Sequence, residues 1–490
     1  MKYTTSTGII AACTTLIGCS VGPDYERPAA EDLVPDAWLA ATESAPSVDI
    51  TGWWMQLKDP ELTDLIERAF VSSLTLAEAR ERIIAARAQR GISNADRRPQ
   101  VDGSASYGRA QTGDEGLNFA GPPPGQEVDL YSLGVVAGWE VDLWGRVGRL
   151  VAAADAEIDA ALEDLRASRV ALAAEVAREV VFIRALDRDA DLIRTTIETS
   201  RDAFEIARSR ANAGFGSNLD VALAQRALDS NLALLPPIAA DRREAEFRLA
   251  VLLGDTPGSV DIANAPLPRR DIVPSKGVPA DLLLRRPDLR GAERDLAAAT
   301  ARIGAAKAEW YPRVSLSGSI TLQGPDPDDA INPDAYALLA GPTITIPIFE
   351  GGRIRSRIQQ AESGQRAALL RLQSLVLTAL SEVETASMRR ERSEERASLL
   401  RNAESAALDA ERLALDRYTA GQVDFLDVTE ARQSRLAIER TRTLAERDAL
   451  LRLIDLYTAL GGGWQDPNTA TAAEADATAV TPLASRSTAR

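Results

Sequence analysis

Two long stretches without proline constrain the fold of this chain most. Residues 146–235 contain no proline, and neither do residues 348–466; both stretches are rich in Ala, Leu, Arg and Glu, which favour helices. A helix from about residue 146 to 211 would be roughly 100 Å long at 1.5 Å per residue. Helices of that length pack as coiled coils or bundles. We therefore predict a mainly helical fold, broken by Pro236-Pro237 in the first half and unbroken in the second.

The two helical stretches belong to an internal repeat with an offset of about 207 residues. Six residues recur in the same order in both copies: Ala213, Gly214, Leu219, Asp220, Val221 and Ala224, then Ala420, Gly421, Leu426, Asp427, Val428 and Ala431. In each copy a glycine follows a long helical pattern and precedes a new one, which predicts a helix hairpin. The chain reads as a duplication of helix, β-hairpin, long helix, turn and return helix.

Four shorter stretches alternate apolar and polar residues, which predicts strands with one apolar face. They cover residues 101–107, 132–143, 314–322 and 338–348. Each is about ten residues long, the length of a tilted transmembrane strand. Alternation alone suits a soluble β-sandwich equally well. A polar face made almost wholly of Ser, Thr and Gly fits a water-lined pore better.

The first residues have the order of a secretory signal, with a Lys, a short apolar run and small residues. The ending Leu16-Ile17-Gly18-Cys19 resembles a bacterial lipobox. That resemblance implies cleavage before Cys19 and lipid on this cysteine, and Ser20 after it points to the outer membrane. The alternative is an ordinary signal peptide in which Cys19 is incidental.

Composition excludes several classes of function. The net charge of -16 argues against nucleic-acid binding, which needs a basic face. The sequence has no histidine, which excludes His-based triads and zinc sites. The two cysteines, Cys13 and Cys19, lie near the start, and only three methionines occur, so copper transport has no support. We predict neither a metal nor a cofactor.

The repeat and the breaks between patterns predict the domain organisation. The expected parts are a lipoprotein signal peptide (1–18), a lipidated N-terminal arm (19–60), a first repeat (61–255), a Pro-rich linker (256–287), a second repeat (288–464) and a disordered tail (465–490). Within the first repeat, apolar spacing predicts one helix over residues 61–96.

The chain resembles the TolC/OprM family of outer membrane channels. Four motifs carry the resemblance: Cys19–Pro28 (CSVGPDYERP), Val141–Arg146 (VDLWGR), Arg285–Arg290 (RRPDLR) and Leu456–Trp464 (LYTALGGGW). It implies a homotrimer in which each chain gives four strands to one barrel in the outer membrane. The helices would continue as a periplasmic tunnel that meets an adaptor (membrane fusion) protein and an inner-membrane pump, expected to be of the RND type. The expected function is the exit duct of a tripartite efflux system for small molecules or drugs.

The same resemblance assigns a periplasmic gate to the second helix turn. It implies gate acids at Asp427 and Glu430, with Asp424 nearby, and a link between the turns from Tyr418 to Asp220. A companion arginine of the family has no match, since Val423 stands there. Independently of the family, Asp427 and Glu430 lie three apart on one helical face. Threefold repetition would gather about six like charges and favour cations. The alternative is that these acids only stabilise the first turn of a helix.

Other readings stay open at this point. A type I protein-secretion duct would differ only in its partners. A helical scaffold lipoprotein without transport would share the composition. An enzyme would need paired acids such as Asp424 and Asp427 to act as a glycosidase pair, without help from histidine or a phosphate-binding loop.

Overall fold

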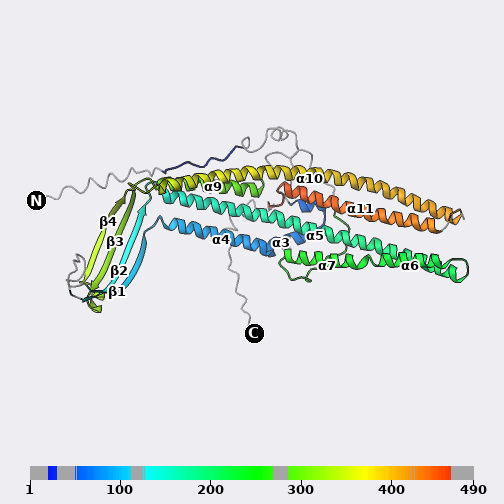
Figure 1. Ribbon diagram of the computed structural model, residues 1–490, viewed down its shortest axis with the longest axis horizontal. Coiled ribbons are helices and arrows are strands. Elements are labelled where there is room, and N and C mark those ends of the chain that lie inside the picture. Colours follow the sequence, from blue (N-terminus) through cyan, green and yellow to red (C-terminus); the bar gives the residue numbers. More distant parts are fainter. Residues whose placement is uncertain are drawn as a thin grey trace. The chain divides into compact units, whose positions relative to one another are not determined.

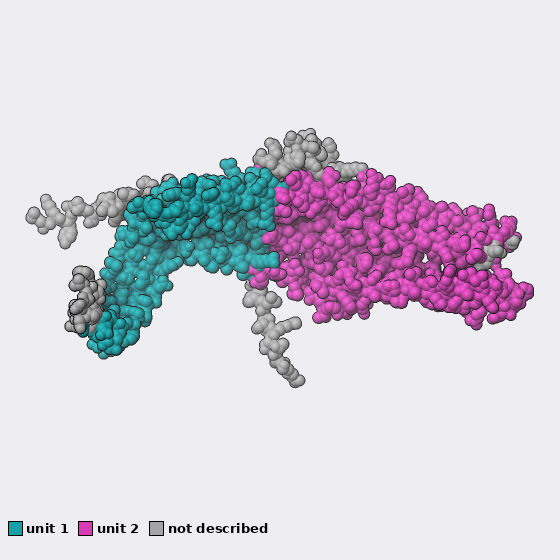
Figure 2. All heavy atoms as spheres, in the orientation of Figure 1, with its two compact units in different colours: residues 1–28, 82–162, 291–373 teal, residues 29–81, 163–290, 374–490 magenta. Residues whose placement is uncertain are grey.

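The structure is a computed structural model that describes residues 20–29, 50, 52–111, 125, 127–268, 285–420, 422–423 and 425–464. The predicted signal peptide, Cys19, Asp424 and the predicted tail lie outside the described residues. The described chain is mainly helical with one small antiparallel sheet, as predicted. It divides into two compact units (Figure 2). Unit 1 comprises residues 1–28, 82–162 and 291–373, and unit 2 comprises residues 29–81, 163–290 and 374–490.

The elements follow one another in two similar series (Figure 1). The first contains η3 (Trp53–Leu57), α3 (Pro60–Ser72), α4 (Leu74–Ala95), β1 (Gln100–Gln111), β2 (Glu127–Val141), α5 (Arg146–Asn212), α6 (Asn218–Leu232) and α7 (Leu235–Leu252). The second contains α9 (Pro287–Ala308), β3 (Arg313–Gly324), η4 (Pro327–Ile331), β4 (Tyr336–Thr345), α10 (Arg353–Thr419) and α11 (Phe425–Ala459).

The long helices are as predicted. Both α5 and α10 have 67 residues. In the first half, the return helix is interrupted between α6 and α7, and the two prolines lie in the first turn of α7, where their missing N–H groups cost no hydrogen bond. In the second half, α11 runs for 35 residues without a break.

The predicted single helix over residues 61–96 is wrong, because the chain breaks into α3 and α4 at Ser73. Ser73 has an extended backbone with ψ 128°, while its N–H still donates to the Ala69 carbonyl. Beside the break, the Ser72 hydroxyl donates to the Leu253 carbonyl at 2.6 Å. Gly254 adopts φ +74°, and a Cβ there would lie 2.4 Å from the Ser72 carbonyl oxygen. A distant segment therefore occupies the space that a continuous helix would fill.

The four strands form one antiparallel sheet in the order β1-β2-β3-β4. Its register places the predicted apolar residues on one face, since Val135 lies opposite both Gly103 and Ile320, and Ile320 lies opposite Leu338. The other face carries the hydroxyls, and the Ser106 and Ser132 hydroxyl oxygens are 2.7 Å apart. The larger apolar residues Val128, Leu130, Val136 and Leu339 depart from this division, since the register places them on the hydroxyl face.

Two strands end earlier than predicted. β2 stops at Val141 and not at residue 143, because the Asp142 carboxylate accepts the N–H groups of Val147 and Gly148 at 3.1 and 2.7 Å and so caps α5. β4 covers Tyr336–Thr345 and not residues 338–348. Pro347 lacks an N–H group for the ladder, which accounts for the earlier end.

Each unit has its own core. In unit 1, α5 and α9 approach closely through alanines: Ala153, Ala156, Ala297, Ala298 and Ala301. In unit 2, aliphatic residues of α5 pack on α6 and α7: Leu186, Ala190, Ile193, Ile197, Leu228 and Ile238. Within the described parts of the chain, no helix is both long and apolar enough to cross a membrane.

Candidate functional site

The first helix turn of unit 2 joins α5 to α6. Gly214 there has φ +80°, a conformation that favours glycine. The Phe215 N–H donates back to the Arg210 carbonyl at 2.8 Å. The Ser217 hydroxyl accepts from the Asp220 N–H at 3.1 Å, and the Asp220 carboxylate accepts from the Ser217 N–H at 3.2 Å. This capping box gives the predicted link residue Asp220 a local role in starting α6.

The second turn, between α10 and α11, closes in the same way. The Gln422 N–H donates to the Arg417 carbonyl at 2.9 Å, at an offset of about 207 residues from the equivalent bond in the first turn. Both turns lie at the same end of unit 2 (Figure 1). The repeat that was visible in the sequence therefore has matching backbone geometry at the turns.

The two described gate acids lie at the start of α11. Asp427 occupies its first turn, and both Asp427 and Glu430 are exposed. Val428 between them is buried, so the acids and the packed residue point in different directions. Tyr418 is half-buried at the end of α10. The link from Tyr418 to Asp220 stays a prediction.

An ion-pair cluster that sequence reasoning missed holds α11 against α10. Arg432 and Arg435 both donate to the Glu411 carboxylate, and Arg435 also donates to Glu439. Burial raises the pKa of Glu411, but the two guanidinium groups together lower it by more. The pKa of Glu411 therefore lies below its ordinary value. The cluster therefore contributes stability at neutral pH, and this contribution is lost only as the pH falls through that lowered pKa.

A second pair joins α11 to α5. Arg440 donates to both carboxylate oxygens of Asp189, at 2.6 and 2.9 Å. Asp189 is only 4% exposed. A charge in the apolar stretch of α5 was the available sequence signal, but its partner lies 251 residues away along the chain.

Two of the four family motifs, Arg285–Arg290 and Leu456–Trp464, meet at a junction in unit 2. Arg286 donates to Asp288, to Glu382 on α10 and to the Ala459 carbonyl at the end of α11. The guanidinium groups of Arg166 and Arg290 lie over the Trp464 ring, 5.0 and 5.5 Å from its centroid. The described residues contain no group of three or more His, Cys, Asp or Glu side chains arranged to hold a metal.

Comparison with known proteins decides what these elements are for. The sequence profile of a family described as "Outer membrane efflux protein" matches residues 65–255 and 278–462. The chain belongs to this family. Outer membrane protein OprJ of Pseudomonas aeruginosa is 32% identical over 464 residues, covering 92% of this chain and 94% of OprJ. Nodulation protein T of Rhizobium leguminosarum bv. trifolii is 30% identical and covers 92% and 95%.

Solved structures agree with the sequence matches. The outer-membrane channel OprN has a TM-score of 0.81 at 33% identity, and the match covers 91% of this chain and all of that one. The open state of the MtrE outer membrane channel of Neisseria gonorrhoeae has a TM-score of 0.78 at 27% identity, covering 91% and 99%. This efflux protein is thus an outer membrane exit duct, and its family consists of transport ducts.

Proposed function

We propose that three copies of this efflux protein form one closed β-barrel in the outer membrane, continued by a helical tunnel. The observation that carries the proposal is the pair of open sheet edges. β1 and β4 are exposed along their whole length, and β2 and β3 lie between them. Open edges are avoided in natural sheets, and closure into a barrel removes them. Three chains would contribute about twelve strands, enough for an aqueous channel.

A stripe of exposed apolar residues on α10 supports the same assembly. Its members recur at intervals of about two, three, three and four helical turns and are each at least half exposed: Leu370, Leu377, Met388, Leu399 and Leu413. Residues at such intervals lie on one face of a helix. A neighbouring chain would bury this stripe.

The duplicated halves, with boundaries near residues 61–255 and 288–464, would each supply one strand pair and one helix hairpin to the wall.

We place the periplasmic gate at the two helix turns. Asp427 and Glu430, together with Asp424, would form a ring of acids in the trimer, and Tyr418 and Asp220 would link the turns in the closed state. The exposure of both described acids supports this placement. A periplasmic adaptor and an inner-membrane pump, of RND type, would complete the system, in keeping with relatives named for solvent and cation efflux.

The assembly has a direct test. Purified protein in detergent should run as a trimer by light scattering coupled to size exclusion, and it should form conducting channels in planar lipid bilayers. A monomer, or a trimer without conductance, would refute the proposed barrel.

The gate acids have a separate expected outcome. Asp427→Asn with Glu430→Gln should reduce cation selectivity and weaken block by divalent cations, because the ring loses its negative charge. Tyr418→Phe is the contrast: it should raise the open fraction severalfold, by the roughly 0.5–1.5 kcal/mol of one hydrogen bond, without changing selectivity. Single-channel recordings report both quantities. An unchanged cation preference in the double variant would leave these acids with a helix-stabilising role alone.

We also propose that Cys19 carries a lipid anchor. Cys19→Ser should abolish incorporation of labelled palmitate and weaken membrane retention, because several acyl chains anchor a protein stably. The matched control is Cys13→Ser, which should label as the unaltered protein does. Labelling that persists in Cys19→Ser would exclude this residue as the lipidation site.

A further inference from the structure

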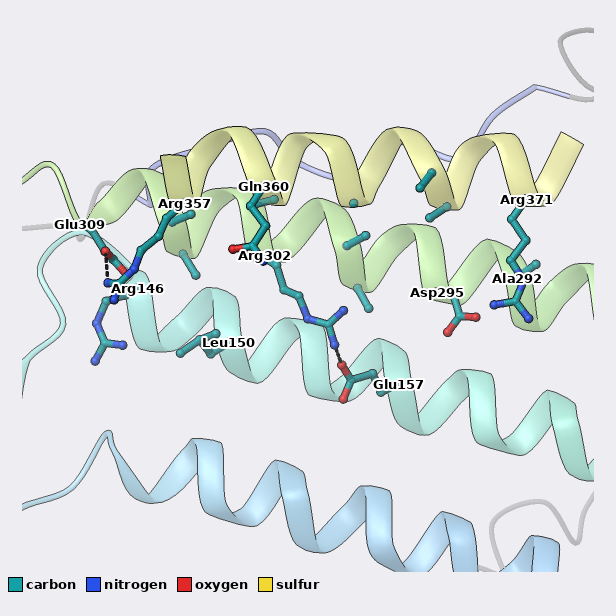
Figure 3. Close-up of a pocket in the computed structure, with 18 residues that line it drawn as sticks. Arg146, Leu150, Glu157, Ala292, Asp295, Arg302, Glu309, Arg357, Gln360 and Arg371 are labelled. Atoms are coloured by element: carbon teal, nitrogen blue, oxygen red, sulfur yellow. Dashed lines mark hydrogen bonds and ion pairs between the residues drawn. The ribbon is translucent and has the colours of Figure 1, made fainter. Parts of the chain in front are cut away.

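Unit 1 contains a cavity that the proposed channel does not explain. It lies between α5, α9 and α10 and has a volume of about 740 Å³ (Figure 3). That volume falls in the range of sites for drug-sized molecules, roughly 300–1,000 Å³. One face of each of the three helices lines it.

The cavity has an apolar floor with charged side chains along its sides, namely four arginines and the carboxylates Glu157, Asp295 and Glu309. The floor consists of small residues: Ala292, Ala298, Ala299, Ala305, Ala306, Ala361, Gly364, Ala367 and Ala368. The cations come from Arg146 on α5, Arg302 on α9, and Arg357 and Arg371 on α10 (Figure 3). Such a combination suits a molecule with an apolar body and an anionic group.

Three of the four arginines already have carboxylate partners. Arg146 donates to Glu140 at 2.9 and 3.0 Å, Arg357 donates to Glu309 at 2.6 Å, and Arg302 donates to Glu157. Arg371 forms no ion pair with any acid in the described part of the chain. Its charge is therefore available to a ligand, and Gln360 on the same helix offers an amide.

The position of the cavity on α9 indicates which side of the wall it faces. The N-terminal arm, residues 20–29, lies on the opposite side of α9, where Tyr25 donates to Glu293 at 2.7 Å. Pro23, Tyr25 and other arm residues line a separate hollow there together with Leu296, Thr300 and Ile303. The cavity uses Asp295, Ala299 and Arg302 instead. In the proposed tunnel, an arm that extends from a lipid anchor must lie outside the wall, so the cavity faces the lumen.

We propose that this cavity is a transit site for amphipathic organic anions, with Arg371 pairing with the anionic group and the alanine floor contacting an aromatic or aliphatic body. The proposal rests on the proposed channel function and names a class of cargo for it. Arg302 and Arg357 add a positive field but stay engaged with their own carboxylates. A neutral molecule of the same shape would contact the alanine floor but would not form the ion pair with Arg371.

Equilibrium binding to the purified full-length protein in detergent tests the site without any need for conduction. Isothermal titration with 2-naphthoate should show binding that Arg371→Gln weakens about tenfold. The neutral 2-naphthamide should bind to the unaltered protein about tenfold more weakly than 2-naphthoate does. A Cβ at Gly364 would meet no atom within 4 Å, so Gly364→Leu should fit the fold and fill the cavity. It should abolish binding of both molecules.

The control variant is Arg412→Gln, which removes an exposed arginine on the same helix outside the cavity. It should leave naphthoate binding unchanged. Equal affinity for naphthoate and naphthamide, or unchanged binding in Arg371→Gln or Gly364→Leu, would overturn the proposed site.

Bilayer recordings of the same proteins separate this inference from the channel proposal. Naphthoate should reduce the current of the unaltered channel more than that of Arg371→Gln. A channel that conducts but neither binds naphthoate nor shows this difference would disprove the site and leave the duct intact. Binding by a protein that does not conduct would disprove the channel proposal and keep the anion site.

Discussion

Replacing Arg440 with methionine should loosen α11 from α5 by about 3 kcal/mol. Asp189 receives both of its described side-chain hydrogen bonds from Arg440, and it is only 4% exposed. Removing one partner of a buried pair leaves an uncompensated charge, which costs about 3–5 kcal/mol. The lower figure applies here because the Arg440 side chain is itself 38% exposed. Methionine keeps most of the packing of the arginine stem.

Hydrogen exchange measures this effect directly. Amides of α11 around residue 440 should exchange faster in Arg440→Met, and thermal unfolding followed by circular dichroism should shift to lower temperature. Adding Asp189→Asn should restore most of the protection, because the buried charge is then gone. Arg392→Met, which removes an exposed pair with Glu395, should change neither measurement. Full protection in Arg440→Met would show that packing alone holds the two helices.

The second large effect concerns the apolar face of the sheet. Ile320→Arg should destabilise the barrel in lipid by about 2–4 kcal/mol if the residue lies near the bilayer midplane. Ile320 is 54% exposed and lies opposite Val135 and Leu338, which are exposed on the same face. An arginine there would meet lipid on the outside of the proposed barrel.

Ser317→Arg is the matched control, because Ser317 lies on the same strand and on the hydroxyl face. This substitution should destabilise the barrel only slightly, since the arginine side chain would meet water in the lumen. Urea titration of protein folded into lipid vesicles compares the two variants. Equal loss of stability in both would refute a barrel whose apolar face contacts lipid.

The long helices and the strands were predictable because their signals are periodic and local. Alanine, leucine, arginine and glutamate without proline define α5 and α10, and the alternation of apolar and polar residues locates β1 to β4. The break at Ser73 was not predictable, because its cause is the approach of Leu253 and Gly254 from the far end of the first half. Apolar spacing continues smoothly through that position.

The same contrast between local signals and contacts of distant segments applies to the residues of the candidate site. The place of Asp427 and Glu430 at a helix start was predictable because a repeated turn marks it, and their exposure is a local property of that start, whereas their role at a gate stays a prediction. Asp189 and Arg440 are invisible to that reasoning, since pairing depends on how two distant helices face each other. Arg371 gains its interest only from the helices that surround it, since its spacing on α10 is that of an ordinary exposed charge.

The unbroken course of α11 has a mechanical consequence. A helix of 35 residues without proline or glycine resists bending, so we expect α11 to move as one rigid rod between Asp427 and Ala459. The pair with Asp189 lies about 22 Å from the start of the helix and joins it to α5. We therefore expect a displacement of the turn to reach the far end, where the Ala459 carbonyl accepts a hydrogen bond from Arg286. The return in the first half is interrupted between α6 and α7, with prolines in the first turn of α7, and we expect it to bend at that break instead.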